Sequence, residues 1–388
     1  MTKPSKPPAN PTLHHIAEAL GISRTTVSEI LSGSDRYSDA KRTQVLDMAT
    51  TMNYRPNRSA QIVRKGRSNL IGVVHHGGQL QVAHERAYYL GHYISETGYD
   101  LLLADITWYQ KNPVSMVNYM IDSRVEGIVF SGPSAIDSPE NMQLLDRMEK
   151  ANIPVVFISS ESVKGIPTIN SDFADGFYQL TKHLISNGRR RLTLLLSGHP
   201  ESAWHGVHRW RGFTKAIEEA GGEVRPPLAV NEYLKAWTGD SLQGEVVYSH
   251  ADIGSRFSPF DTPQYIMEQL LDRGFSSDAL VASNDDWAAS AISVCIRRGI
   301  DVPGELAVTG FDNSNIAKLS PVQITTASQQ SDHACRLGID LLMKRMNGAK
   351  ETTNSILIPC PIIIRESSGS NLKSRSRHST KKHLRSAP

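Results

Sequence analysis

Residues 12–31, TLHHIAEALGISRTTVSEIL, contain the strongest fold signal in the chain. Ile16, Ala17 and Leu20 recur at the spacing of one helical face, which predicts a short amphipathic helix. Gly21 follows directly, and glycine adopts the positive φ that ends a helix without steric strain. The first half of the stretch therefore predicts a helix that stops at a tight turn.

A second and a third helix are predicted after this turn. Ser23 can cap the second helix, on which Val27, Ile30 and Leu31 form another apolar face. A third helix opens after Ser38. Its apolar positions are Val45, Leu46, Ala49 and Met52. Two short helices joined by a glycine turn form the helix-turn-helix pattern of DNA-reading domains, with a plain helical bundle as the alternative.

The composition predicts a globular protein without a membrane span. The chain has 388 residues with a formal net charge of +3, and 39% of them are hydrophobic. It contains no run of 18 apolar residues, and the opening segment MTKPSKPPANP lacks the apolar core of a secretory signal. Cys295, Cys335 and Cys360 are far apart, which excludes a disulfide scaffold and a cysteine-based zinc site and fits a reducing cytosol.

Basic residues concentrate at both ends of the chain. Residues 1–67 contain eleven Lys and Arg against five Asp and Glu, a net charge of +6, and residues 371–388 add another +6 with no acid. Because the whole chain carries +3, the residues between these ends carry −9. Such ends attract polyanions, although a basic tail can also be merely solvated. We expect residues 371–388 to be a disordered tail that adds salt-sensitive affinity for DNA.

The segments IAEALGIS, RTTVSEILSG and NYRPNRSAQIVRKGRS occur in the order and spacing of a known DNA-binding head. With them, residues 12–67 resemble the head of the LacI/GalR (lac repressor) family of bacterial transcription regulators, and the resemblance extends over nearly the whole chain up to the basic tail. It implies that the second predicted helix enters the major groove of DNA. The positions that match DNA contacts of the family in this region are Ser23, Arg24, Thr25, Thr26, Ser28 and Glu29.

Arg24 and Glu29 differ in what they can recognise. Arg24 can donate to O6 and N7 of guanine. The hydroxyls of Ser23, Thr26 and Ser28 match contacts to phosphates, which position the protein without reading sequence. Where the family commonly has Arg, this chain has Glu29, whose carboxylate can accept from N4 of cytosine but cannot donate to guanine. The half-site is therefore expected to differ from that of the family; alternatively, Glu29 faces solvent and only weakens binding.

Residues 57–68 resemble the hinge helix of the family, which two copies insert into the minor groove of DNA. Asn57 and Ala60 match the family, and Val63 stands where the family has the leucine that wedges a base step. Arg64 is expected to contact phosphate. A helix this short is marginal in water, so we expect it to order only on DNA.

From Asn69 onward, apolar runs alternate with amphipathic stretches, which predicts an α/β class with doubly wound parallel sheets. The predicted strands are 70–74, 101–104, 127–130, 154–159, 192–197, 279–283, 306–309 and 356–364. Roughly 300 residues suit two lobes better than one sheet. The motifs IPVVFIS, HRWRGFTKAIEEAGG, ASNDDWAASAI, LAVTGFDN and IIIRESSG resemble the effector-binding core of the family, which is similar to periplasmic sugar-binding proteins.

The resemblance implies four regions. They are a helix-turn-helix head (1–56), a hinge helix (57–68), a two-lobed effector-binding and dimerisation core (69–370) and the tail (371–388). The first lobe is expected at about residues 69–165 and 330–350, and the second at about 166–328 and 352–368. The matching crossings between the lobes lie near residues 160–170, 326–330 and 350–355. A ligand in the cleft would touch strand ends of both lobes.

Five positions match ligand contacts of the family. They are Ser159, Arg209, Asn284, Asp312 and Gln329. Arg donates in a fork, Asp accepts from paired hydroxyls, and Asn and Gln do either, which suits a sugar or a sugar derivative. Arg209 could instead lie on a surface helix, and Asp285 and Asp286 are expected to cap the helix that starts there. Two departures, HHGGQLQVAHE after the first strand and Ser159 after the fourth, leave the ligand unnamed.

Aromatic and imidazole side chains near these positions have two interpretations. Trp204, Trp210 and Trp287 could stack on a sugar, although Trp210 can equally belong to the core. The histidines near the predicted strand ends have no metal-ligand spacing and are interpreted as structural residues. They are His75, His76 and His205.

Together these features predict a DNA-binding transcriptional regulator, expected to be a repressor, whose affinity for DNA depends on a small ligand, expected to be a carbohydrate. Two heads on a homodimer would bind a pseudo-palindromic operator in the cytoplasm, at the nucleoid and away from any membrane. The alternative is a solute-binding protein for sugar transport, which would have a signal peptide and no head. No G-x-S-x-G, P-loop, H-E-x-x-H or dinucleotide motif occurs, so we expect no enzyme activity, catalytic residue, metal or cofactor.

Overall fold

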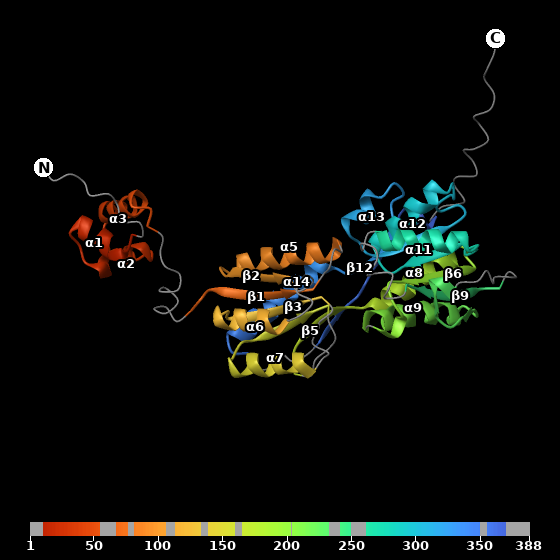
Figure 1. The fold of residues 1–388 in the computed structure, drawn as a ribbon, viewed down its shortest axis with the longest axis horizontal. Coiled ribbons are helices and arrows are strands. Elements are labelled where there is room, and N and C mark those ends of the chain that lie inside the picture. The colour runs from red at the N-terminus through yellow and green to blue at the C-terminus, as the bar shows by residue number, and fades with distance from the viewer. Residues whose placement is uncertain are drawn as a thin grey trace, which may run out of the picture. The chain divides into compact units, whose positions relative to one another are not determined.

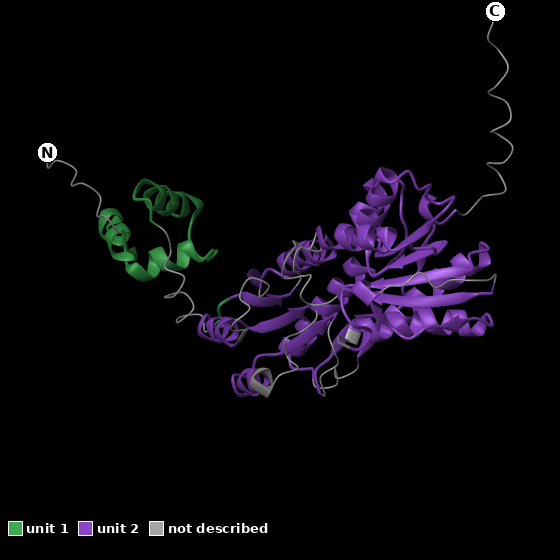
Figure 2. Ribbon diagram, turned by 45° about the vertical axis from the view of Figure 1, so that its right-hand side comes forward, with its two compact units in different colours: residues 1–68 green, residues 69–388 purple. Residues whose placement is uncertain are grey.

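The chain forms two compact units, residues 1–68 and residues 69–388 (Figure 2). The computed structural model describes residues 11–54, 67–76, 81–105, 113–132, 139–159, 165–202, 204–232, 241–249, 261–349 and 355–369. Each unit has a hydrophobic core of its own. Most of the expected hinge and the whole basic tail lie outside the described residues.

The described part of the first unit consists of α1 (Leu13–Leu20), α2 (Arg24–Leu31) and α3 (Asp39–Thr51). The helices meet in a small core of Ile16, Ala17, Val27, Ile30, Val45 and Ala49. Gly21 ends α1 with φ +62°, as expected. Leu46, expected on the apolar face of α3, is 48% exposed. Val45 and Ala49 point into the core, and the side chain of Leu46 points about 100° away from that of Val45 around the helix axis. The predicted helix-turn-helix is confirmed.

The first sheet of the second unit is six-stranded and parallel, in the order β13-β5-β4-β3-β1-β2. The strands are β1 (Leu70–His75), β2 (Asp100–Asp105), β3 (Gly127–Ser131), β4 (Val155–Ile158), β5 (Thr168–Ser171) and β13 (Ile356–Ile358). In register, Ile71 of β1, the strand next to the edge strand β2, lies between Leu101 and Gly127. Apolar residues on both faces of this sheet are buried, as expected for a parallel sheet between helices.

Two pairs of helices cover the first sheet (Figure 1). On one face lie α5 (Gln81–Glu96) and α14 (Ser331–Met346), and on the other α6 (Pro113–Asp122) and α7 (Pro139–Lys150). Side chains alternate between the two cores along each strand: Val73 packs under α5 and α14, whereas Val74 packs against α6 and α7.

The second sheet has the order β14-β12-β11-β10-β6-β9-β7, with β8 also paired to β9. The strands are β6 (Arg191–Leu196), β7 (Glu223–Val224), β8 (Leu228–Ala229), β9 (Gln243–Tyr248), β10 (Ala279–Ala282), β11 (Ala307–Asp312), β12 (Thr325–Ser328) and β14 (Ile362–Ile363). All its pairs are parallel except β12 with β14, which is antiparallel. The expectation of purely parallel strands is therefore wrong at this edge.

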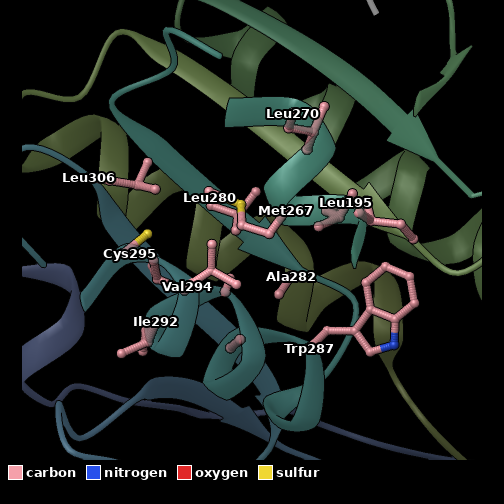
Figure 3. Packing of buried hydrophobic residues seen from close by; sticks show 14 of the residues in the cluster. Leu195, Met267, Leu270, Leu280, Ala282, Trp287, Ile292, Val294, Cys295 and Leu306 are labelled. Carbon is pink, nitrogen blue, oxygen red and sulfur yellow. The ribbon is translucent and has the colours of Figure 1, made fainter. Parts of the chain in front are cut away.

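Helices again cover both faces of the second sheet. One face carries α8 (Phe173–Ser186) and α9 (Trp204–Glu219), and the other α11 (Asp261–Asp272), α12 (Asp285–Arg297) and α13 (Asn315–Leu319). Figure 3 shows the second of these cores, in which Met267 and Trp287 pack with Leu280 and Leu195 from the sheet. The α/β architecture with two doubly wound lobes is confirmed.

Of the three crossings between the lobes that the sequence predicts, the one near residues 326–330 agrees with the structure, and the other two lie later in the chain than predicted. The sequence places β5 and β13 in the second lobe, but both pair within the first sheet. The chain therefore crosses after Ser171, after Ser328 and between Ile358 and Ile362. The run 356–364, expected as one strand, is divided between the two sheets. Pro359 and Pro361 explain the division, because proline has no N–H to continue a strand ladder.

None of the helices in the described part of the chain combines the length and the apolar character that a membrane span requires.

Candidate functional site

The start of α2 is fixed by hydrogen bonds of its own capping residues. The Ser23 hydroxyl accepts from the Thr26 backbone N–H at 3.0 Å, and the two hydroxyls lie 2.9 Å apart. A serine at this position satisfies a backbone donor that would otherwise lack a partner. The cap that the sequence predicts is therefore present, and it fixes the first turn of α2.

Arg24 and Thr25 are exposed on this first turn. They line a surface hollow of about 720 Å³ together with Leu13, Ser28, Glu29, Ser32, Gly33 and Ser34. Thr26 is half-buried, and Ser28 is only 9% exposed at the wall of this hollow. Of the predicted contacts in the described part of this unit, Ser23, Arg24 and Thr25 are exposed, and the others are half-buried or buried.

Glu29 is held by a partner that the sequence does not reveal. The Tyr37 hydroxyl, in the loop between α2 and α3, donates to Oε2 of Glu29 at 2.5 Å. This hydrogen bond is the main cause of the raised pKa of the Tyr37 phenol. Glu29 is thus neither free in solvent nor turned into the core, and only one of its two carboxylate oxygens is used by Tyr37. A loop tyrosine eight residues away carries no periodic signal in the sequence.

The predicted hinge contacts Asn57, Ala60, Val63 and Arg64 lie outside the described residues.

A cleft of about 450 Å³ lies between the two lobes of the second unit. Its walls are the first half of α5 from the first lobe, the segment 312–318 from the second lobe, and the crossing 328–332. The lining side chains include His84, Glu85, Tyr88, Asp312 and Lys318. The lobes are also joined directly here, because the Asn315 backbone N–H donates to Oε1 of Glu85 at 3.2 Å.

Asp312 is the one predicted ligand residue that lines this cleft, and Gln329 contacts it. Asp312 ends β11 with φ +113°, a backbone conformation that non-glycine residues rarely adopt. Gln329 donates from Nε2 to Oδ1 of Asp312, and its own carbonyl accepts from the Ser171 hydroxyl at 2.8 Å. Burial raises the pKa of Asp312 well above its ordinary value, and the neighbouring Asp285 raises it further.

Arg209 lies in α9 and is buried, so it is not a surface helix residue. Its guanidinium lies over the rings of Phe173 and Phe177, 5.3 and 5.8 Å from their centres. Burial lowers its pKa to about 10, while Asp312 acts in the opposite direction. Arg209 and Asp312 therefore interact electrostatically within the second lobe.

Asn284 has the capping role that the sequence suggests for its neighbours. Its side chain accepts from the Trp287 backbone N–H at 3.0 Å at the start of α12. Asp285 lies in the first turn, fully buried, and its Oδ2 accepts from the backbone N–H and the hydroxyl of Ser314 at 2.8 and 3.1 Å. The N-cap residue is therefore Asn284 and not Asp285 or Asp286, which follow it in the first turn of the helix.

The remaining predicted residues are Ser159, which is buried at the end of β4, and three tryptophans in helices. Ser159 follows β4 with φ +57°, and its backbone N–H donates to the Ile169 carbonyl at 2.9 Å. Trp287 and Trp210 pack in or against the cores of the second lobe, so neither is a free platform for a sugar. The side chain of Trp204 lies outside the described residues.

Two of the histidines interpreted as structural are neutral at physiological pH. Burial lowers the pKa of His75 to about 4 and that of His205 to about 3. His75 lies 3.3 Å from the Ser131 hydroxyl at the end of the first sheet. In the described part of the chain, no cluster of three or more His, Cys, Asp or Glu residues could hold a metal ion.

Three residues of α5 lie at or near the cleft although the sequence does not predict them there. Glu85 joins the lobes and Tyr88 lines the cleft, whereas Arg86 is buried and interacts electrostatically with Asp312, which lines the cleft. Arg86 occupies a position between Val82 and Leu90 on the buried face of the helix. A helical pattern predicts an apolar residue there, and the charged residue at this position is the signal that could identify it.

Family models match three parts of the chain. The model described as bacterial regulatory proteins, lacI family, matches residues 12–57. The model of periplasmic binding proteins and sugar binding domain of LacI family matches residues 88–231, and the periplasmic binding protein-like domain matches residues 181–368. The matches follow the division into a helical unit and a two-lobed unit.

Relatives and solved structures match over almost the full chain. The transcriptional regulator DegA of Bacillus subtilis is 26% identical over 92% of this chain and 97% of its own. Catabolite control protein A of Priestia megaterium is 24% identical over 91% and 97%.

Among solved structures, the lac repressor dimer bound to operator and the anti-inducer ONPF has a TM-score of 0.71 at 21% identity, covering 92% of this chain and 99% of that one. The CelR-cellobiose complex has a TM-score of 0.60 at 24% identity, covering 92% and 100%. The fold is therefore shared with both, and the family models and full-length relatives show that the chain belongs to the LacI family of bacterial regulatory proteins.

Proposed function

We propose that the chain is a transcriptional repressor that binds a pseudo-palindromic operator as a homodimer, under the control of a sugar or sugar derivative in the interlobe cleft. The observation that carries the proposal is that the two units present different kinds of site. The first unit exposes Arg24 and Thr25 on a capped helix, and the second surrounds a cleft with buried polar groups. The lac repressor solved with operator and CelR solved with cellobiose support both halves of the proposal. Such a protein acts at the chromosome, in the cytoplasm.

The first turn of α2 supplies the proposed base contacts. Arg24 donates to O6 and N7 of guanine. Glu29, held by Tyr37, uses its remaining oxygen to accept from N4 of cytosine. Thr25 stands beside Arg24 at a position that reads base edges, and the hydroxyls of Ser23, Thr26 and Ser28 position α2 against the DNA backbone. The hinge residues Asn57, Ala60, Val63 and Arg64 are proposed to contact the minor groove, with Val63 as the apolar wedge.

Selection of bound duplexes from a random pool with the full-length protein tests the DNA half. We expect a two-fold repeated half-site containing guanine at the position of Arg24. Arg24→Ala should weaken binding to the selected duplex by about 10- to 100-fold, because alanine cannot form the bidentate pair with guanine. Arg190→Ala, an exposed arginine of the second unit, is the control and should leave binding unchanged. A pool without sequence preference, or equally weakened binding in both variants, would contradict the proposal.

The ligand acts by shifting the balance between lobe arrangements. A molecule that contacts both lobes binds one arrangement more tightly and so changes the population that can hold the operator. Arg209→Ala should abolish the rise in melting temperature caused by a ligand found in a panel of sugars and sugar acids, while DNA binding without ligand persists. If the variant keeps the ligand-induced rise, Arg209 does not belong to the site.

A further inference from the structure

Two arginine side chains from opposite lobes are buried without a hydrogen-bond partner among the described residues, and both interact electrostatically with Asp312, which lines the cleft. Arg86 in α5 is 5% exposed and Arg209 in α9 is 9% exposed. The Nε atom of each has no hydrogen-bond partner, and neither guanidinium forms a hydrogen bond or an ion pair within the described part of the chain. An uncompensated buried charge is strongly unfavourable, so such groups in a native fold call for a counter-charge.

The same fold provides partners for another buried arginine and for a half-buried one. Arg189, 7% exposed, donates from Nη1 to the Gly304 carbonyl at 3.2 Å and from Nη2 to the Pro303 carbonyl. Arg365 donates to the Ile324 carbonyl at 2.7 Å and to Asn313 at 2.6 Å. These two side chains hold neighbouring segments in place through hydrogen bonds. Arg86 and Arg209 have no such contacts among the described residues, which sets them apart as a pair.

The surroundings of the pair lie at the junction of the lobes. Arg86 interacts electrostatically with His75, at the end of β1, and with Asp312, at the end of β11 in the other lobe. Arg209 interacts with the same Asp312. Asp312 already accepts from Gln329 and is buried beside Asp285. One such carboxylate cannot neutralise two guanidinium groups.

We infer that Arg86 is a ligand-binding residue, and that Arg86 and Arg209 together bind an anionic group of the cleft ligand, a carboxylate or a phosphate. The inference deepens the proposed function, on which it rests, by narrowing the sugar or sugar derivative to a sugar acid or a sugar phosphate. Guanidinium forks match the oxygen pairs of both groups. Because the two forks come from different lobes, an anion held by both would favour the arrangement in which the lobes are together.

Thermal melting of the full-length chain in simple anions tests the inference without knowledge of the whole ligand. The probes are acetate and inorganic phosphate, each compared with chloride at equal ionic strength. We expect one of them to raise the melting temperature of the wild type by about 3 °C at saturation. A larger response to acetate identifies a carboxylate ligand, and a larger response to phosphate identifies a phosphate ligand. Phosphate also stabilises proteins by exclusion from their surface, so the quantity compared is the difference between wild type and variant.

The variant Arg86→Met keeps an unbranched stem but removes the charge. In chloride it should melt at the same temperature as the wild type or higher, because a buried charge without a partner is removed. Its response to acetate and phosphate should disappear. The control variant Arg189→Met should melt at a lower temperature, since it leaves the Pro303 and Gly304 carbonyls without their hydrogen-bond donor. It should keep the anion response. If Arg86→Met melts lower in chloride and keeps the response, or if the wild type melts alike in all three salts, the inference is wrong.

Binding of a duplex by Arg86→Met, measured at low salt, separates this inference from the proposed function. Retained binding together with an absent anion response supports both. Failure of the wild type itself to bind any duplex overturns the proposed function, whereas the anion response in the melting experiment still decides the role of Arg86.

Discussion

Burial at the cleft changes the acid-base chemistry of single side chains. Asp285 is fully enclosed, and burial raises its pKa to about 7 although Ser314 donates two hydrogen bonds to it. Desolvation therefore outweighs hydrogen bonding at this residue, even though the Thr326 side chain hydrogen-bonds to it as well.

The raised pKa of Asp285 predicts that stability declines as the pH rises from about 4 to about 7. In this range the unfolded chain releases a proton that the folded chain still holds, so proton release favours unfolding. Asp285→Asn should remove part of this decline and raise the melting temperature at pH 7.5. Melting curves from pH 4 to pH 8 measure the effect. Asp340→Asn, an exposed position on α14, is the control; identical pH slopes for both variants would refute the assignment.

Glu29 and Tyr37 predict a change of base preference. Glu29→Gln gains an N–H donor, so the duplexes that it selects from a random pool should tolerate bases other than cytosine at the facing position. Tyr37→Phe removes only the donor to Glu29 and should weaken the preference without replacing it. Sequencing of the selected pools measures both. Unchanged pools for Glu29→Gln would show that Glu29 reads no base.

For single residues, the sequence predicts which positions are important better than it predicts their roles. Ser23 is recognisable as a cap because capping depends on the residue type and three following positions. Asn284, which the sequence places at the ligand, caps a helix in the structure, since an Asn before an acidic pair fits either role. Arg86 escapes prediction because its importance depends on Asp312, 226 positions later in the chain, and no local pattern joins the two.

Gly21 shows how one element depends on a single backbone conformation. A Cβ at this position would meet nothing within 4 Å, so only its φ of +62° constrains the residue. Gly21→Ala should destabilise the helix-turn-helix unit by about 1 kcal/mol. Hydrogen exchange of α1 and α2 amides in the full chain should accelerate roughly fivefold. Gly21→Asn is the matched control, because Asn tolerates positive φ and should exchange more slowly than the Ala variant. Equal exchange in the two variants would contradict this account.

Among the elements, long periodic ones are predictable and short edge strands are not. The buried strands β1, β3, β4, β6 and β10 follow from continuous apolar runs. β5 and β12 escape prediction, because TINS and TTAS are polar sequences whose strand form depends on pairing with distant partners. The expectation that β5 and β13 belong to the second lobe fails for the same reason, since topology is decided by pairing and not by local composition.

Over the complete chain, the charge distribution predicts a role for the basic tail. Residues 371–388 carry six Lys and Arg and no acid. Deleting them should make the dependence of log K on log salt less steep, by about 0.9 for each phosphate that the tail neutralises, while the selected operator sequence stays the same. Titrations of one duplex at several salt concentrations measure the slope. An unchanged slope would mean that the tail contacts no DNA.

The position of α14 and β13 in the first lobe has a consequence for biosynthesis. The first sheet starts at Leu70, but its covering helix is residues 331–346 and its edge strand is residues 356–358. While the ribosome is still translating the second lobe, the nascent first lobe lacks both and exposes the apolar surface that they cover. The helix-turn-helix unit, by contrast, has its whole core encoded before residue 55 and can fold early. Premature termination before residue 331 would therefore release a folded head attached to an aggregation-prone remnant.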